Sequence, residues 1–317
     1  MMTLQVPLEI RRHQLVSKVR EVIQNQDVVV GVSGGGDSIA LLLLCIAASM
    51  QQESSFSIIA GHIHHGLRDT SDDELLQVEA ICKRFGVTCV TKIIEVQKID
   101  GSLAAGAREA RYTALCAIAT EYKMTAIAVA HHAEDQLETM LMALCRGGGM
   151  RKLAGMMPTR PLTDSIHLIR PLLHVEKRTL LEICSMAQVE WCEDPTNSDC
   201  STPRGRLRHD VIPILRELWP AADRHAANAA SLLHPAIDAF DDSILSGSSW
   251  SRESLNQLTP PAIAATVHHA VGTHATFETV QSIVNAIVDG DTDPRTFVCS
   301  DGCVVNVTAH HVEVVYT

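Results

Sequence analysis

Residues 28–38, VVVGVSGGGDS, run from a group of valines into three consecutive glycines. The valines are typical of a buried β-strand, and the apolar residues 39–48 predict a buried helix directly after the loop. Glycine permits the positive φ and the close backbone approach that a tight loop between these two elements needs. Because the backbone N–H groups of such a loop and of the helix N-terminus can converge on an anion, this stretch predicts a phosphate-binding loop.

The polar side chains of this loop are candidates for direct contacts with a phosphate. Ser33 and Ser38 carry hydroxyls, and Asp37 opens the helix, where its carboxylate can hold Mg²⁺. The common phosphate-loop patterns do not fit, because no Lys follows the last glycine and the G-x-G-x-x-G spacing fails at its third glycine. A tight turn without a ligand is the alternative.

The first half of the chain alternates short β-rich runs with helical ones. Candidate strands are residues 27–32, 56–62, 87–96 and 125–130. Candidate helices are residues 37–50, 72–85, 102–122 and 133–145. Strands separated by helices of this length predict an α/β fold with a doubly wound, mostly parallel sheet, whose ligands bind beyond the carboxyl ends of the strands.

The second half of the chain has a different pattern. Residues 151–215 are rich in Arg and Pro, and residues 220–290 are rich in Ala and helical in pattern. Residues 296–316 contain strand runs broken by Ser-Asp-Gly. We therefore predict a first domain over residues 1–210 and a smaller, mainly helical C-terminal domain over residues 211–317 that ends in a β-hairpin.

The charge of the chain is unevenly distributed. The formal net charge is −11, which by itself argues against a nucleic-acid partner. Residues 146–224 nevertheless carry 12 basic and 10 acidic side chains, whereas residues 225–317 carry 2 and 10. A polyanion larger than a nucleotide is therefore expected to bind mainly to the middle segment.

The cysteines and the apolar runs bear on redox chemistry and location. The ten cysteines are scattered and include no C-x-x-C pair, and Cys299 and Cys303 flank what we interpret as a hairpin turn rather than a metal site. The longest apolar run is too short to cross a bilayer, and the N-terminus lacks the order of a secretory signal. We expect a cytoplasmic protein with no membrane partner.

A second group of polar residues falls at another expected strand–helix junction, VAHHAEDQLETMLMALCRGGG at residues 129–149. His131 lies at the expected strand end, and Asp135 and Glu138 are one helical turn apart on the same face. Two such carboxylates repel each other unless a cation lies between them. The pair therefore predicts a cation site at the strand ends, with an ordinary solvated acidic pair as the alternative.

These stretches resemble a known enzyme family. The pattern S-G-G-x-D-S is similar to the pyrophosphate loop of the N-type ATP pyrophosphatases, the PP-loop superfamily. Residues 129–149 resemble the A-H-H-x-x-D-Q-x-E-T … R-G-x-G signature of the tRNA(Ile)-lysidine synthase family. Further stretches match this family in order and spacing, namely HIHHGLRDTSDDE, AREARYTAL, IRPLL, EDPTNSD and RGRLRHDVIPIL. The resemblance covers residues 20–220 and implies a Rossmann-like PP-loop ATPase domain.

The resemblance implies an ATP-dependent ligase. Such an enzyme adenylates C2 of the wobble cytidine of tRNA(Ile) with a CAU anticodon and joins the ε-amine of free L-lysine to form lysidine, releasing AMP and pyrophosphate. ATP and Mg²⁺ are the implied cofactors, and a homodimer is compatible with the resemblance. The alternatives are a PP-loop tRNA thiolase, for which paired cysteines would be expected, and a nucleotide- and tRNA-binding module without catalysis.

The resemblance also implies roles for individual residues. The implied catalytic residues are Asp37, Arg111, Asp135 and Glu138. The implied ATP-binding residues are Ser33, Gly34, Gly35, Gly36, Asp37, Ser38, His62 and His131. Asp135 and Glu138 would bind the lysine amine, and Asp37 would hold the metal. A purely structural role for His62 or His131, and a solvated position for Arg111, remain open.

The basic middle segment supplies the candidates for tRNA contacts. They are Arg170, Lys177, Arg178, Arg204, Arg206, Arg208 and His209. Such side chains can neutralise backbone phosphates. Gly205 stands where the family pattern R-N-x-[IL]-R has Asn, so the local contact of that amide is absent from this chain.

Overall fold

The computed structural model describes residues 5–51, 56–64, 71–94, 103–147, 149–192, 200–241 and 244–316. The chain divides into two compact units, Met1–Leu232 and Leu233–Thr317, which we describe separately. The sequence predicted that the first domain ends at residue 210, and that domain boundary stays a prediction. None of the helices that the structure describes is both long and apolar enough to cross a bilayer.

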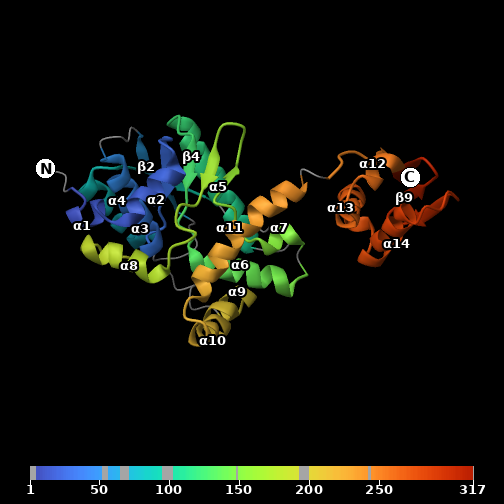
Figure 1. Ribbon diagram of the computed structural model, residues 1–317. Helices are drawn as coiled ribbons and strands as arrows, with labels where there is room; N and C mark the ends of the chain where they lie inside the picture. The colour runs from blue at the N-terminus through green and yellow to red at the C-terminus, as the bar shows by residue number, and fades with distance from the viewer. Residues whose placement is uncertain are drawn as a thin grey trace. The chain divides into compact units, whose positions relative to one another are not determined.

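The first unit is built on a six-stranded sheet with the order β3-β2-β1-β4-β6-β5. Figure 1 labels β2 and β4 of this sheet. Its strands are β1 (Val28–Gly31), β2 (Ile58–His64), β3 (Thr88–Ile93), β4 (Ala126–Ala128), β5 (Thr159–Pro161) and β6 (His167–Ile169). All neighbours are parallel except β5, which runs antiparallel to β6 at the edge. The predicted doubly wound, mostly parallel sheet is confirmed.

Helices cover both faces of this sheet, which is why the valine run is buried throughout. The helices of the unit are α1 (Leu8–Arg11), α2 (Gln14–Ile23), α3 (Gly36–Ser49), α4 (Ser71–Phe85), α5 (Leu103–Glu121), α6 (Ala133–Cys145), α7 (Met150–Leu153), α8 (Lys177–Met186), α9 (Pro203–Arg206), a π-helical turn (Leu207–Val211), α10 (Ile212–Leu218) and the start of α11 (Ala222–Asp241). Val28 and Val30 belong to the hydrophobic core that contains α3. Val29 belongs to the opposite core, with Leu115 and Ile118 of α5.

The predicted elements of this unit differ from the observed ones mainly at the sheet edge. The four predicted strands and the four predicted helices all exist, although residues 95–100 lie outside the described part. The short strands β5 and β6 were not predicted. Each has only three residues, too few for a clear period of two, and β5 includes Pro161, which an edge strand tolerates.

The second unit combines helices with a small antiparallel sheet. Its helices are α12 (Arg252–Asn256), α13 (Pro260–Val271), a 3₁₀ turn (Gly272–His274) and α14 (Phe277–Val288). Its strands are β7 (Ser249–Ser251), β8 (Arg295–Val298), β9 (Cys303–Val307) and β10 (His311–Tyr316), in the order β7-β10-β9-β8. The predicted helical region with a terminal β element is confirmed, and β7 adds a strand from before the helices.

The cysteine pair of the second unit flanks a turn. Asp301 and Gly302 have φ values of 54° and 73°, and the Cys299 N–H donates to the Cys303 carbonyl at 2.8 Å. Two successive positive φ values are typical of a type I′ hairpin turn. The interpretation of this stretch as a hairpin is therefore confirmed.

Gly61 of β2 provides a test of how tightly α5 packs on the sheet. A Cβ atom at Gly61 would lie 2.9 Å from both Leu115 Cδ2 and Val29 Cγ1. We expect Gly61→Ala to lower the free energy of unfolding by about 1–3 kcal/mol, because the added methyl group overpacks the core. Urea unfolding measures this change. Gly149→Ala is the matched control, since no heavy atom lies within 4 Å of the added Cβ; an equal loss in both variants would contradict the packing described.

Candidate active site

The glycine loop, residues 33–38, joins the carboxyl end of β1 to the first turn of α3. Gly34 has a φ of 93°, which favours glycine, whereas Gly35 is the N-cap of α3 with a φ of −72°. A Cβ atom at Gly36 would lie 2.7 Å from Leu181 Cδ2 and 3.3 Å from the Trp191 ring. Two of the three glycines therefore meet requirements of the fold itself.

The two serines of the loop hydrogen-bond to each other and to the loop backbone. The Ser38 hydroxyl accepts from the Ser33 N–H at 3.1 Å and from the Ser33 hydroxyl at 3.2 Å. It donates to the Gly35 carbonyl at 2.8 Å. These hydrogen bonds hold the loop in its conformation without a ligand. Direct contacts of Ser33 and Ser38 with ATP stay a prediction.

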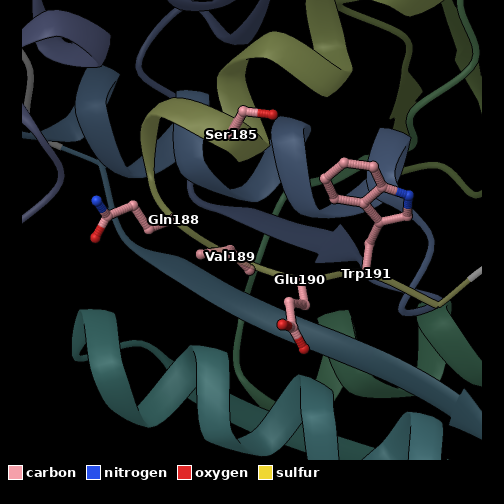
Figure 2. A pocket seen from close by; sticks show the side chains of 5 residues that line it. All are labelled: Ser185, Gln188, Val189, Glu190 and Trp191. Carbon is pink, nitrogen blue, oxygen red and sulfur yellow. The ribbon is translucent and has the colours of Figure 1, made fainter.

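The segment from the last turns of α8 to Cys192 packs over this loop. The Cys192 N–H donates to the Gly34 carbonyl at 3.0 Å, and the Cys184 thiol donates to the Gly36 carbonyl at 3.3 Å. The same segment borders a pocket of about 600 Å³, lined by Ser185, Gln188, Val189, Glu190 and Trp191 (Figure 2). In Figure 2 the side chains of Trp191 and Glu190 leave the backbone in opposite directions. None of these five described residues was a predicted site residue.

Asp37 lies in the first turn of α3 and is partly exposed. Its Oδ2 atom is 3.5 Å from Nε2 of His132. Its Oδ1 atom is buried and has no hydrogen-bond partner in the described part of the chain. A carboxylate oxygen without a partner is a donor that Mg²⁺ prefers, so the residues present fit the predicted metal.

Asp135 and Glu138 project from the first two turns of α6, as the one-turn spacing predicted. The side chain of Glu138 is fully buried, and that of Asp135 is nearly so. The Asp135 Oδ2 atom accepts from the His132 backbone N–H at 3.0 Å and so also caps the helix. The alternative of a solvated acidic pair is thereby excluded for this structure.

Two guanidinium groups bind this carboxylate pair, and each of them contacts both acids. Arg204 Nε lies 2.6 Å from Glu138 Oε2, and its Nη2 lies 3.0 Å from Asp135 Oδ1. Arg208 Nε lies 2.6 Å from Glu138 Oε1, and its Nη2 lies 3.4 Å from Asp135 Oδ1. The carboxylate pair is therefore paired with cations, which are the chain's own arginines, and a site for an external cation stays a prediction.

The charge states of the neighbouring groups follow from this arrangement. Burial opposes the negative charge of Asp135, but His132, His131 and Arg204 outweigh it and hold its pKa at about 2. Burial lowers the pKa of His131 to about 3, so its ring is neutral near pH 7. Burial also opposes the charge of His132, but Asp135 and Asp37 outweigh it and raise the pKa of that ring.

His62 ends up in a structural position. It is buried in β2, and its Nδ1 atom donates to the Val32 carbonyl at 2.9 Å. Burial lowers the pKa of this ring. His62 therefore supports the backbone just before the glycine loop, and its contact with ATP stays a prediction.

The predicted arginine and lysine contacts separate into buried and exposed groups. Arg170 is buried after β6 and donates to the Met157 carbonyl at 2.6 Å, and Arg111 lies on α5. Arg178 and Arg206 are exposed. Arg178 lies 3.8 Å from Glu176 and 3.9 Å from Glu182, and Arg206 lies 3.2 Å from Asp210. The structure thus places Arg178 and Arg206 on the surface, turns Arg204 and Arg208 toward the carboxylates, and leaves Lys177 partly buried on α8.

Comparison with known proteins identifies the family. Residues 5–215 match the family model described as the PP-loop domain. A tRNA(Ile)-lysidine synthase from Polaromonas naphthalenivorans is 34% identical over 253 residues, which are 76% of this chain and 73% of that protein. The chain belongs to the tRNA(Ile)-lysidine synthase family. The family resemblance predicted from the motifs is confirmed.

Other relatives of the tRNA(Ile)-lysidine synthase family are longer than this chain. The enzyme of Chromobacterium violaceum is 39% identical over 67% of this chain and 48% of its own length. That of Pseudomonas aeruginosa is 36% identical over 74% of this chain and 51% of its own length. The chain therefore spans about half the length of these two relatives.

A solved structure shares the fold. The U34-tRNA thiolase NcsA from Methanococcus maripaludis, solved with its [4Fe-4S] cluster, matches with a TM-score of 0.56 at 18% identity. The match covers 69% of this chain and 78% of that one. At this identity the likeness shows a common fold and nothing about chemistry.

Two parts of this tRNA(Ile)-lysidine synthase family site were not predicted. His132 bridges Asp37 and Asp135, at 3.5 Å and 3.6 Å from Nε2, and its signal was the second histidine of the A-H-H triplet. Arg216 binds Glu134 at 3.1 Å and Asp223 at 2.8 Å, which ties α10 and α11 to α6. Glu134 and Arg216 lie tens of residues apart in the sequence, as do Asp37 and His132, and no local pattern connects either pair.

The pKa of Asp135 predicts a pH effect on stability. The folded-state pKa of Asp135, about 2, lies below the ordinary value of 3.8. The ionised carboxylate therefore stabilises the folded state above pH 3.8, and this stabilisation is lost as the pH falls through about 2. At about pH 5 the free energy of unfolding of the wild type should exceed that of Asp135→Asn. This difference between the two proteins should be roughly 2 kcal/mol smaller at about pH 2. Urea unfolding at both pH values measures this difference.

The exposed pair of Arg206 and Asp210 supplies the control. Asp210→Asn removes an exposed ion pair, which contributes only about 0–1 kcal/mol. A gap between wild type and Asp135→Asn that stays constant over this pH range would contradict the charge arrangement described.

Proposed function

We propose that the chain is an ATP-dependent ligase that adenylates C2 of the wobble cytidine of tRNA(Ile) with a CAU anticodon and joins the ε-amine of lysine to it. The observation that carries this proposal is the contact series Asp37–His132–Asp135. It links the glycine loop, where ATP phosphates would bind, to the buried carboxylate pair within two contacts of 3.5 Å and 3.6 Å. Activation and amine attack can therefore occur in one site.

The glycine loop would hold the leaving group. Backbone N–H groups of residues 34–36 and the N-terminus of the 14-residue helix α3 favour an anion at this position. Asp37, through its unpartnered Oδ1 atom, would hold Mg²⁺, which neutralises phosphate charge when bound. His132 lies 3.5 Å from the same carboxylate, which together with Asp135 raises the pKa of the ring. The C2 oxygen then attacks the α-phosphorus, and pyrophosphate leaves.

The carboxylate pair would bind the lysine ammonium by displacing a guanidinium. The Arg204 side chain is 43% exposed, whereas that of Arg208 is 23% exposed. Because the Arg204 guanidinium is already partly in water, its ion pair is the weaker of the two and the easier to displace. An ammonium that replaces Arg204 at Glu138 Oε2 keeps the buried acid paired.

Proton transfer from the ammonium has a preferred acceptor. The low pKa of Asp135 suits it to binding a cation and makes it a weak base. We therefore assign proton acceptance to Glu138. The neutral amine then attacks C2, and AMP leaves with the C2 oxygen. Arg111 would balance the negative charge that develops in this step.

The remaining assignments rest on the family. ATP use follows from the PP-loop domain, whereas Mg²⁺, a cytoplasmic location and a homodimer stay predictions. Contacts of Lys177, Arg178 and Arg206 with tRNA phosphates also stay predictions, and the exposure of Arg178 and Arg206 supports them. We assign Arg204 and Arg208 to the carboxylate pair in the absence of substrate.

Lysine incorporation tests the function. We expect labelled lysine to enter transcribed tRNA(Ile) with a CAU anticodon only when ATP is present, with one AMP formed per lysine. Replacing the wobble cytidine should stop incorporation, and Asp37→Ala should stop both incorporation and AMP formation. AMP formation without lysine incorporation would contradict the proposed nucleophile and favour the thiolase alternative.

Two substitutions at the carboxylate pair should have opposite effects on lysine use. Glu138→Gln should lower kcat/KM for lysine at least about tenfold, because the amine loses its charged partner and its base. Arg204→Gln should lower the KM for lysine, because it removes the competing guanidinium. Steady-state kinetics measure both, with ATP affinity followed by equilibrium dialysis.

The exposed Glu9 of α1 supplies the matched control for this experiment. Glu9→Gln makes the same chemical change far from any proposed contact and should leave lysine kinetics unchanged. A raised KM for lysine in Arg204→Gln would contradict the displacement of Arg204.

A further inference from the structure

Four arginines gather around Tyr112 next to the carboxylate site, and we name them the arginine cluster. Its members are Arg108 and Arg111 on α5, Arg160 on β5 and Arg170 directly after β6. The guanidinium carbons of Arg108, Arg111 and Arg160 lie 5.1, 5.3 and 5.5 Å from the centre of the Tyr112 ring. Such distances allow cation–π contacts, and three cations share one ring.

The arginine cluster has no anion of its own. In the part of the chain that the structure describes, no carboxylate forms an ion pair with any of its four members. Burial and the neighbouring arginines lower the pKa values of Arg108 and Arg170. Arg170 is buried, Arg111 and Arg160 are half-buried, and Arg108 is exposed. A buried positive charge such as that of Arg170 is costly unless a negative group joins it.

Polar atoms inside the arginine cluster also lack partners. Arg111 Nε, Arg170 Nε and the Tyr112 hydroxyl are buried and have no hydrogen-bond partner among the described residues. Arg170 as a whole is only 4% exposed, and its one described side-chain hydrogen bond goes to the Met157 carbonyl. These unpartnered donors indicate a ligand that brings oxygen acceptors.

The location separates this ligand from the ATP phosphates. The glycine loop leads into α3, on the face of the sheet that Val28 and Val30 contact, whereas α5 packs on the opposite face with Val29. The arginine cluster lies beside β6 and β5, at the far edge from β3. His131 connects it to the carboxylate pair, since Arg170, Arg108 and Asp135 all affect the pKa of that ring.

We propose that the arginine cluster binds a phosphodiester group of the tRNA next to the wobble nucleotide. This proposal rests on the proposed function, because a wobble base that reaches Asp135 and Glu138 brings its own flanking phosphates with it. Guanidinium groups match phosphate oxygens with paired N–H donors, and Tyr112 holds several of their planes in place. The arginine cluster thus positions the base for adenylation and supplies positive charge next to the wobble nucleotide.

Two substitutions at the more accessible members test the proposal while leaving the buried Arg170 in place. Arg108→Gln and Arg160→Gln should each weaken tRNA binding about threefold to tenfold and lower the slope of log Kd against log salt by about 1. ATP affinity, measured by equilibrium dialysis, should not change. Arg12→Gln removes an exposed arginine after α1 and is the matched control.

A modified tRNA identifies the phosphate. Full-length tRNA is ligated from fragments that carry one neutral methylphosphonate on either side of the wobble nucleotide. One such change should weaken binding to the wild-type chain, and the same change should cost nothing further in Arg160→Gln. This non-additivity would establish direct contact between that phosphate and the arginine cluster.

The possible results separate this inference from the proposed function. Folded Arg108→Gln and Arg160→Gln variants with unchanged tRNA affinity, in a wild-type chain that binds tRNA and incorporates lysine, would overturn the arginine-cluster proposal alone. A loss of ATP affinity with unchanged tRNA affinity would also overturn it and assign the cluster to ATP. A wild-type chain that neither binds tRNA nor incorporates lysine would overturn the proposed function.

Discussion

The ion pairing of Asp135 and Glu138 is the interaction on which the site depends. Both carboxylates are buried at the start of α6, and a buried acid must be paired or protonated. Arg204 and Arg208 supply this pairing from a segment about seventy residues further along the chain, so the same contacts fold that segment against α6. A substrate group that displaces one of these arginines takes over its contact with a buried carboxylate. That group must be positively charged, because a neutral group would leave the carboxylate without a partner of opposite charge.

The two histidines that precede α6 lie in different electrostatic environments. Asp135 and Asp37 raise the pKa of His132 against the effect of burial, whereas burial lowers the pKa of His131 to about 3 and keeps its ring neutral. His132 connects the acids to the glycine loop, and His131 connects them to the arginines around Tyr112. Phosphate, amine and RNA backbone would each meet a different part of one continuous polar region at the carboxyl ends of the strands.

Local sequence patterns determine part of this arrangement. The valine run with its glycine loop and the one-turn spacing of Asp135 and Glu138 predicted a phosphate loop and a cation site, because both features depend on residues that are close in the sequence. The partners could not be predicted in the same way. Contacts such as Arg204 with Glu138, or Arg160 with Tyr112, depend on how distant segments pack, and the three-residue strands β5 and β6 that position Arg160 and Arg170 carry too little periodicity to detect. Gly36 is a further example. The sequence alone explains this glycine by the close approach of a ligand, but its packing against Leu181 and Trp191 explains it equally well.

The proposed reaction requires that the oxygen at C2 of the wobble cytidine becomes bonded to the α-phosphorus of ATP before lysine replaces it. The most direct test uses tRNA(Ile) with ¹⁸O at C2 of that cytidine, incubated with ATP, lysine and the full chain, followed by mass spectrometry of the AMP. The account predicts that AMP carries one ¹⁸O atom for each lysine incorporated. AMP that contains only oxygen from ATP and water would contradict adenylation of the base and, with it, the proposed chemistry of the site.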